Sequence, residues 1–158
     1  MDDMPKKNRQ MPAIQPPDAR LGFMLYRCGL AVSRGYERAL KPIQTAPAEA
    51  GVLSALAYRG PNHVRGLARM LGLGRQTIVN VTRRLEAAKL LQNSHSDEDG
   101  RLLVFCITQE GQRKLSQIEN IATAFDLQLR EIVGTAHGSE MTKQLQRIVD
   151  APFLAYGD

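Results

Sequence analysis

Six polar or basic side chains gather in residues 75–84, at spacings that suit the exposed side of one helix. They are Arg75, Gln76, Thr77, Asn80, Arg83 and Arg84. Arginine binds phosphate oxygens, whereas glutamine, threonine and asparagine can hydrogen-bond the exposed edges of bases. The set therefore predicts binding to double-stranded DNA.

The surrounding residues 67–91 predict the pair of helices that would position this polar side. Apolar residues at helical spacing define a short first helix and a longer second one. These positions are Leu67, Ala68 and Leu71 in the first helix, and Ile78, Val81 and Leu85 in the second. Gly72 and Gly74 mark the turn between them. A helix, a tight turn and a basic second helix are typical of a helix-turn-helix.

The alternative interpretation is an ordinary amphipathic helix with a solvated polar side. Solvated helices usually alternate acidic and basic residues, but Glu86 is the one acidic residue between Arg75 and Leu91. Residues 59–91 carry seven basic side chains and one acidic side chain, whereas residues 102–158 are net negative. The positive charge is therefore densest where a polyanion would bind, which favours DNA binding.

Composition limits the class of protein. A chain of 158 residues with 43% hydrophobic residues predicts one compact domain, or one domain with extensions, and its net charge is +5. No apolar run approaches the ~18 residues of a membrane span, and residues 1–9 do not resemble a secretory signal. Cys28 and Cys106 lie far apart and form no disulfide framework. We expect a cytoplasmic protein.

A β-hairpin is predicted directly after the second helix. Two β-prone segments, residues 90–95 and 102–107, flank an Asp99-Gly100 pair, which is a strong hairpin signal. A hairpin at this position is a wing, and Arg101 beside its tip could enter the minor groove. The alternative is an arginine that only solubilises the hairpin tip.

Long helices are predicted on both sides of this unit. Asp18 is expected to cap the first helix, and Asn62 is expected to cap the first helix of the helix-turn-helix. Thr108 is expected to cap a helix that runs to Val133, and Ser139 is expected to begin the last helix. Their apolar stripes exceed what a small winged domain needs, so we expect a homodimer. The predicted organisation is a flexible arm (1–17), a first dimerisation helix (18–44), a winged helix-turn-helix domain (45–108) and C-terminal dimerisation helices (109–158).

The ordered set of motifs resembles the MarR family of bacterial transcriptional regulators. The core of the resemblance is Leu67-Ala68, Leu71-Gly72, Gln76-Thr77-Ile78, Arg84-Leu85-Glu86 and Leu90-Leu91. The wing pattern runs from Asp99-Gly100-Arg101 through Ile107-Thr108 to Gly111, and residues 21–26 are similar to the start of the family's first helix. The likeness covers residues 20–152. It implies a mainly α fold with a small two-stranded β wing, flanked by dimerisation helices.

The resemblance also implies a function. Family members are dimers that usually repress a neighbouring operon and leave DNA when a small molecule binds, often a phenolic or aromatic acid. By position, Gln76, Thr77 and Asn80 would face bases, Arg75, Arg83 and Arg84 would face phosphates, and Arg101 would enter the minor groove. This chain departs from the family at Asn80, where many relatives have arginine, and in the acidic residues 97–99 near the wing tip.

Candidates for an effector site are few. Tyr26 and Tyr36 could stack on an aromatic ligand, Arg27 could bind its carboxylate, and His63 lies at the edge of the winged domain. Tyr36 as a core residue and Arg27 as a solvated one are the alternatives.

Other chemistries have weaker support in the sequence. Cys28 is interpreted as a small core residue and Cys106 as a packing residue of the wing, and Gly22 stands where one subgroup of the family has a peroxide-sensing cysteine. His63, His95 and His137 lack metal-ligand spacing, and no enzyme motif or cofactor is expected. A redox-switched or constitutive regulator, or a winged-helix protein-interaction module, remains an alternative.

Overall fold

A computed structural model describes residues 16–95 and 103–152, which divide into two units at residues 34 and 35. The described part of the first unit holds a short 3-10 helix, η1 (Pro17–Ala19), and most of helix α1 (Leu21–Leu40). The second unit begins with the end of α1 and holds the remaining elements. They are η2 (Lys41–Ile43), α2 (Pro47–Arg59), α3 (Val64–Leu71), α4 (Arg75–Ala87), β1 (Leu91–His95), β2 (Leu103–Ile107), α5 (Gln109–Val133) and α6 (Thr135–Val149).

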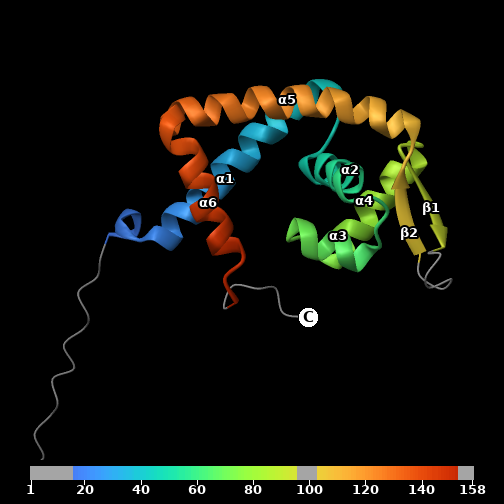
Figure 1. The fold of residues 1–158 in the computed structure, drawn as a ribbon, viewed down its shortest axis with the longest axis horizontal. Helices are drawn as coiled ribbons and strands as arrows, with labels where there is room; N and C mark the ends of the chain where they lie inside the picture. The colour runs from blue at the N-terminus through green and yellow to red at the C-terminus, as the bar shows by residue number, and fades with distance from the viewer. Residues whose placement is uncertain (1–15, 96–102, 153–158) are drawn as a thin grey trace, which may run out of the picture. The chain divides into compact units, whose positions relative to one another are not determined.

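Helix α2 is the centre of the second unit and contacts α3, α4, α5 and β2 (Figure 1). It starts with Pro47, whose fixed φ and missing N–H suit a first helical position, and ends at Gly60 with a φ of 82°. Apolar residues occur around most of its circumference, so it can be buried from several sides. Its buried residues are Ala50, Val52, Leu53, Ala55 and Leu56, which form the middle of the hydrophobic core.

Helices α3 and α4 form the predicted helix-turn-helix. Gly72 ends α3 in the left-handed region, with a φ of 62°, and Gly74 is the N-cap of α4. The predicted apolar side of α4 is confirmed, because Ile78, Val81 and Leu85 are all buried in the core.

The predicted wing is also present in its described part. Strands β1 and β2 are antiparallel, with Leu91 opposite Ile107 and His95 opposite Leu103. Phe105 additionally exchanges two backbone hydrogen bonds with Asn62, at 2.8 and 3.2 Å. These bonds fix the wing to the segment that leads into α3. The predicted turn at Asp99-Gly100 lies outside the described residues.

The root of the wing is fastened to the start of α5. Thr108 caps α5 as predicted, because its Oγ1 accepts a hydrogen bond from the Gly111 N–H at 3.0 Å. The same hydroxyl donates to the Lys89 carbonyl at 2.8 Å. Lys89 itself has a φ of 60°, so this turn is held in a conformation that lysine rarely adopts. Helix α5 runs over α2 and meets α6 at Gly134 (Figure 1).

Several predicted helix boundaries are wrong. Asp18 lies within η1 and α1 begins at Leu21. The N-cap of α3 is His63, not Asn62, because its Nδ1 accepts from the Gly66 N–H at 2.9 Å. Helix α6 begins at Thr135, four residues before Ser139, because Gly134, with a φ of 85°, breaks the helical path and is itself the N-cap of α6. No helix in the described ranges is both long and apolar enough to span a membrane.

Candidate nucleic-acid interface

The side of α4 that faces away from the core carries the six residues singled out in the sequence. All six are exposed, namely Arg75, Gln76, Thr77, Asn80, Arg83 and Arg84. The buried residues of α4 fix its orientation, because Ile78, Val81 and Leu85 occupy the core on the opposite side. The helix thus presents an edge of donors and acceptors to solvent, as a helix that enters a DNA groove must.

Gln76 and Asn80 form a pair within this surface. The Gln76 Nε2 donates to the Asn80 Oδ1 at 3.2 Å, across one turn of α4. This contact uses the Asn80 amide oxygen as its acceptor, holds the two side chains next to each other and leaves the Asn80 amide nitrogen able to donate to another group. Two neighbouring amides provide both donors and acceptors, which is what hydrogen bonding to base edges requires.

Arg84 has a partner that the sequence did not predict. Its Nε lies 3.0 Å from Oε1 of Glu49 in α2, and the side chains are 59% and 17% exposed respectively. Glu49 also accepts from the Ala46 N–H at 2.9 Å, so one carboxylate caps α2 and holds the end of α4. The pattern of an acid three residues after a helix N-cap could have indicated the capping role. Nothing local could have indicated the pair, because its members are 35 residues apart.

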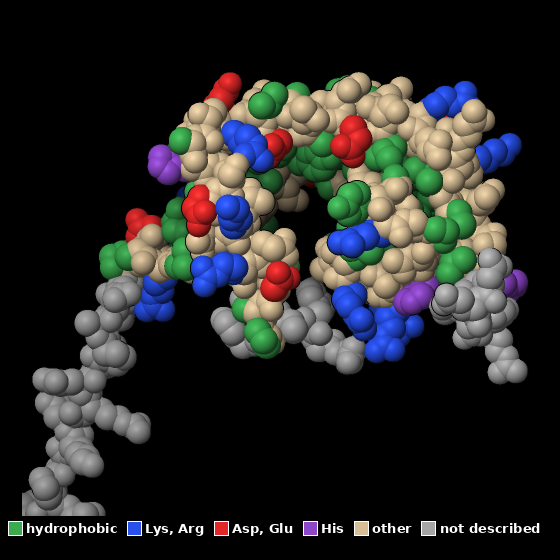
Figure 2. Space-filling model, in the orientation of Figure 1, with side chains coloured by type: hydrophobic (Ala, Val, Ile, Leu, Met, Phe, Trp, Pro, Cys, Tyr) green, Lys and Arg blue, Asp and Glu red, His purple; other side chains and the backbone are tan. Residues whose placement is uncertain are grey.

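Positive charge extends from α4 onto the neighbouring helix. Arg65 and Arg69 of α3 are exposed, as are the arginines of α4. Figure 2 shows Lys and Arg side chains gathered along the lower edge of this part of the molecule. Glu86, the acidic residue of α4, accepts a hydrogen bond from Asn93 of β1 and so contributes to the wing contact. Such a basic edge favours a polyanionic partner.

Arg101, predicted to enter the minor groove, lies outside the described residues, so its position stays a prediction. The described wing ends at His95 and Leu103, which are paired across the hairpin.

The four predicted effector residues have separate surroundings. In the first unit, Tyr26 is 64% exposed, and the Arg27 guanidinium lies 5.9 Å from the centre of the Phe23 ring. In the second unit, Tyr36 packs on Phe125 of α5, with ring centres 5.4 Å apart. His63 caps α3.

Tyr36 is a weaker acid in the folded chain than a free tyrosine. Burial, and to a lesser degree the charge of Glu119, raises the pKa of the Tyr36 hydroxyl above its ordinary value of 10.0. Its contacts are those of a half-buried packing residue. This is the alternative that the sequence left open for Tyr36.

The cysteines and histidines form no shared site among the described residues. Cys28 is exposed in this chain, so its interpretation as a core residue is wrong for the single chain, whereas Cys106 is half-buried in β2. The described ranges contain no group of three or more His, Cys, Asp or Glu residues that could hold a metal ion.

Comparisons with known proteins find one family that is similar to this chain. Residues 44–102, which include α2, α3, α4 and β1, match a model of the MarR family. An HTH-type transcriptional repressor of Mycobacterium tuberculosis, Rv2887, is 26% identical over 131 residues, which are 83% of this chain and 94% of the relative. The structure of Rv2887 in complex with salicylic acid superposes with a TM-score of 0.68 and covers 83% of this chain and 97% of Rv2887.

Two further solved structures have the same fold. The repressor CouR of Rhodococcus jostii, solved on a 23-mer DNA duplex, has a TM-score of 0.76 and 26% identity, and the match covers 83% of this chain and 93% of CouR. Bordetella bronchiseptica BpsR, whose DNA binding is regulated by 6-hydroxynicotinic acid, has a TM-score of 0.80 and 20% identity, covering 88% of this chain and 99% of BpsR. The helix-turn-helix segment of this chain thus matches the MarR family of transcriptional regulators over residues 44–102, and the chain is similar to members of that family beyond this segment.

Proposed function

We propose that this chain is a homodimeric repressor that binds a palindromic operator and is released from it by a small aromatic acid. The observation that carries the proposal is the exposed polar edge of α4, held outward by the buried Ile78, Val81 and Leu85. The relatives support it, because Rv2887 is a transcriptional repressor and CouR has been solved on DNA. The protein would act in the cytoplasm, without catalysis.

The residues of α4 would divide the work of recognition. Gln76, Thr77 and Asn80 would contact base edges, and Arg75 and Arg83 would contact phosphates on either side. Arg84 would contribute to phosphate binding less than Arg83, since Glu49 already neutralises part of its charge. Arg101 would reach the minor groove from the wing tip.

Both units leave apolar side chains uncovered, which supports a homodimer. On α1 of the first unit, Leu21 is 70% exposed, and Phe23, Met24 and Leu30 are also exposed. At the C-terminal end of the second unit, Ile132 is 80% exposed. Apolar side chains that gather on one exposed helix favour an interface with another chain. A second copy would cover them and place two α4 helices about one helical turn of DNA (~34 Å) apart.

The ligand class follows from the relatives. Rv2887 has been solved with salicylic acid, and BpsR is regulated by 6-hydroxynicotinic acid. Both are compact aromatic acids, so we infer a ligand of this kind. The proposed organisation is an N-terminal arm (1–17), a first dimerisation helix (18–44), the winged domain (45–108) and C-terminal dimerisation helices (109–158).

The decisive experiment measures DNA affinity and its salt dependence. A duplex selected from a randomised library and a scrambled duplex of equal length are titrated by fluorescence anisotropy. Six to ten phosphate contacts would weaken binding about 10³- to 10⁵-fold between 50 and 200 mM salt. No salt-dependent affinity for either duplex would instead favour a protein-interaction module.

Substitutions in α4 assign the roles. Asn80→Ala should cost ~1–3 kcal/mol on the selected duplex and little on the scrambled one, because it removes a base contact and frees Gln76. Arg83→Gln should weaken both duplexes and reduce the salt slope by about 1. Lys143→Gln, an exposed charge on α6, is the matched control. An equal loss on both duplexes would make Asn80 a backbone contact.

A further inference from the structure

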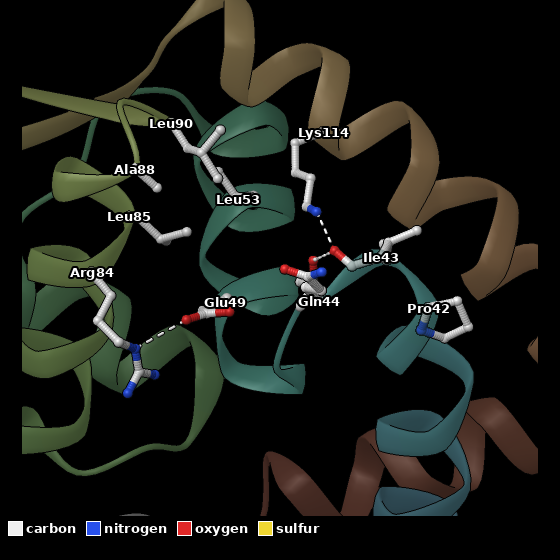
Figure 3. Close-up of a pocket in the computed structure, with 11 residues that line it drawn as sticks. Pro42, Ile43, Gln44, Glu49, Leu53, Arg84, Leu85, Ala88, Leu90 and Lys114 are labelled. Carbon is white, nitrogen blue, oxygen red and sulfur yellow. Dashed lines mark hydrogen bonds and ion pairs between the residues drawn. The ribbon is translucent and has the colours of Figure 1, made fainter.

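The ion pair between Arg84 and Glu49 lies at one side of a cavity of about 380 Å³ in the second unit (Figure 3). The start of α2, the end of α4 and the start of α5 meet at this cavity. A second cation of its lining, Lys114 of α5, donates to the Ile43 carbonyl. Within the described ranges, Arg84 is the cation with which Glu49 forms an ion pair. The pair joins α2 to the helix that carries the candidate DNA-binding residues.

The Glu49 carboxylate is held by contacts at both of its oxygens. Its Oε2 accepts from the Ala46 N–H at 2.9 Å, at the start of α2, and its Oε1 lies 3.0 Å from the Arg84 Nε. The Glu49 side chain is only 17% exposed. A carboxylate that is bonded at both oxygens and largely buried has few alternative rotamers. Glu49 is therefore a fixed acceptor for Arg84 and not a freely moving surface charge.

Glu49 contacts only one part of the Arg84 guanidinium. This group has one N–H donor on Nε, and its other donors are on the two terminal nitrogens. Figure 3 shows Nε as the nitrogen nearest to Glu49, with the terminal nitrogens beyond it. The Arg84 side chain is 59% exposed, so the terminal nitrogens can reach a ligand from solvent. Two adjacent N–H groups of this kind fit two oxygens of one phosphate.

Arg84 lies at one edge of the exposed side of α4. Gln76 and Asn80 are one turn apart and face directly away from the core. Arg84 follows Thr77 by seven residues, which is two helical turns, so both lie on the edge that faces α2. Residues along the edge of a helix in a DNA groove lie beside the phosphates of the flanking strand. The terminal nitrogens of Arg84 are thus placed for a phosphate.

We propose that Glu49 is a positioning residue for DNA recognition, which holds the Nε of Arg84 so that the two terminal nitrogens bind one backbone phosphate. Glu49 also lowers the net charge of this contact, but solvent screening at an exposed pair keeps that loss small. An arginine that is not held has much rotamer freedom to lose when it binds a phosphate. The gain from orientation therefore exceeds the loss of charge. This inference rests on the proposed function and adds a residue of α2 to its recognition surface.

Fluorescence anisotropy with the full-length protein tests the sign of the effect. The amide oxygen of Glu49→Gln can still cap α2 through the Ala46 N–H, but its nitrogen cannot accept from Arg84. This variant should weaken binding of the selected and the scrambled duplex about three- to fivefold and reduce the salt slope by up to about 1. Glu49→Ala, which accepts from neither donor, should weaken DNA binding by a similar factor. Lys143→Gln, on α6, should leave the affinity unchanged, and circular dichroism checks that each variant folds.

A double-mutant cycle separates positioning from a general effect on the fold. In an Arg84→Gln background, Glu49→Gln should change the DNA affinity less than about twofold, because no guanidinium remains to be held. Equal weakening in both backgrounds would overturn the inference, because Glu49 would then act through the stability of α2. Tighter binding and a steeper salt slope in Glu49→Gln would also overturn it, because Glu49 would then only neutralise Arg84. Both results leave the proposed function intact, whereas a wild type that does not bind DNA would overturn the proposed function and this inference together.

Discussion

Replacement of Gly111 by alanine tests how the wing root is fastened to α5. A Cβ at this position would lie 2.2 Å from the carbonyl oxygen of Leu90 and 2.7 Å from Cγ1 of Ile107. The Leu90 carbonyl cannot yield easily, because it accepts from the Thr108 N–H at 3.1 Å. The adjacent Lys89 carbonyl is held by the Thr108 hydroxyl at 2.8 Å. Backbone on both sides of the contact must therefore move.

The expected loss of stability combines three effects. Forced displacement in a packed site costs ~1–3 kcal/mol, and loss of one hydrogen bond costs ~0.5–1.5 kcal/mol. Alanine recovers up to ~1 kcal/mol, since it orders the helix better than glycine. The balance for Gly111→Ala is a loss of about 2 kcal/mol in the free energy of unfolding, or ~4–8 °C in Tm for a chain of this size.

Urea denaturation followed by circular dichroism at fixed protein concentration measures the change. Gly51→Ala in α2 is the matched control, because its Cβ would lie 3.4 Å from a Leu71 methyl group, an ordinary contact. That variant should be unchanged or more stable by ~0.5–1 kcal/mol. Equal effects of the two substitutions, or wild-type stability of Gly111→Ala, would refute the close approach.

Two further substitutions test local structure. His63→Ala should lose about 1 kcal/mol of the free energy of unfolding, because the Gly66 N–H loses its acceptor. His63→Asp restores a capping acceptor and should keep the wild-type stability. Equal urea midpoints for the two variants would contradict the capping role. Because the pKa of Tyr36 is raised above 10.0, its contribution is complete below pH 10 and is lost as pH rises through the folded-state pKa. Unfolding between pH 8 and 11 should therefore show a smaller alkaline loss in Tyr36→Phe, and identical pH profiles would argue against burial of this hydroxyl.

Most elements of the second unit could be predicted from local patterns. Ile78, Val81 and Leu85 repeat at helical spacing, and this spacing identified the buried side of α4 and hence its polar side. Gly72, with a left-handed φ at the end of α3, and the Thr108 cap gave boundaries that the structure confirms. These predictions succeeded because their physical causes act within a few residues along the chain.

The errors arose where several residues could serve the same local purpose. Asn62 and His63 both offer an acceptor before α3. Backbone pairing of Asn62 with Phe105 of the wing leaves the capping role to His63. Similarly, Ser139 is of a residue type that caps helices well, but Gly134 already serves as the N-cap, and α6 begins at Thr135. In each case the sequence offers two residues that could cap the helix.

The sequence alone determined that a basic, amide-bearing helix follows a tight turn and precedes a wing, because periodicity and turn residues are encoded locally. Tertiary structure decided which of those charges has a partner. Glu49 reaches Arg84 across 35 residues, and the packing of α5 on α2 brings the Lys114 ammonium to the Ile43 carbonyl. Coulomb forces and cavities depend on distances in space, which spacing along the chain does not specify once helices pack.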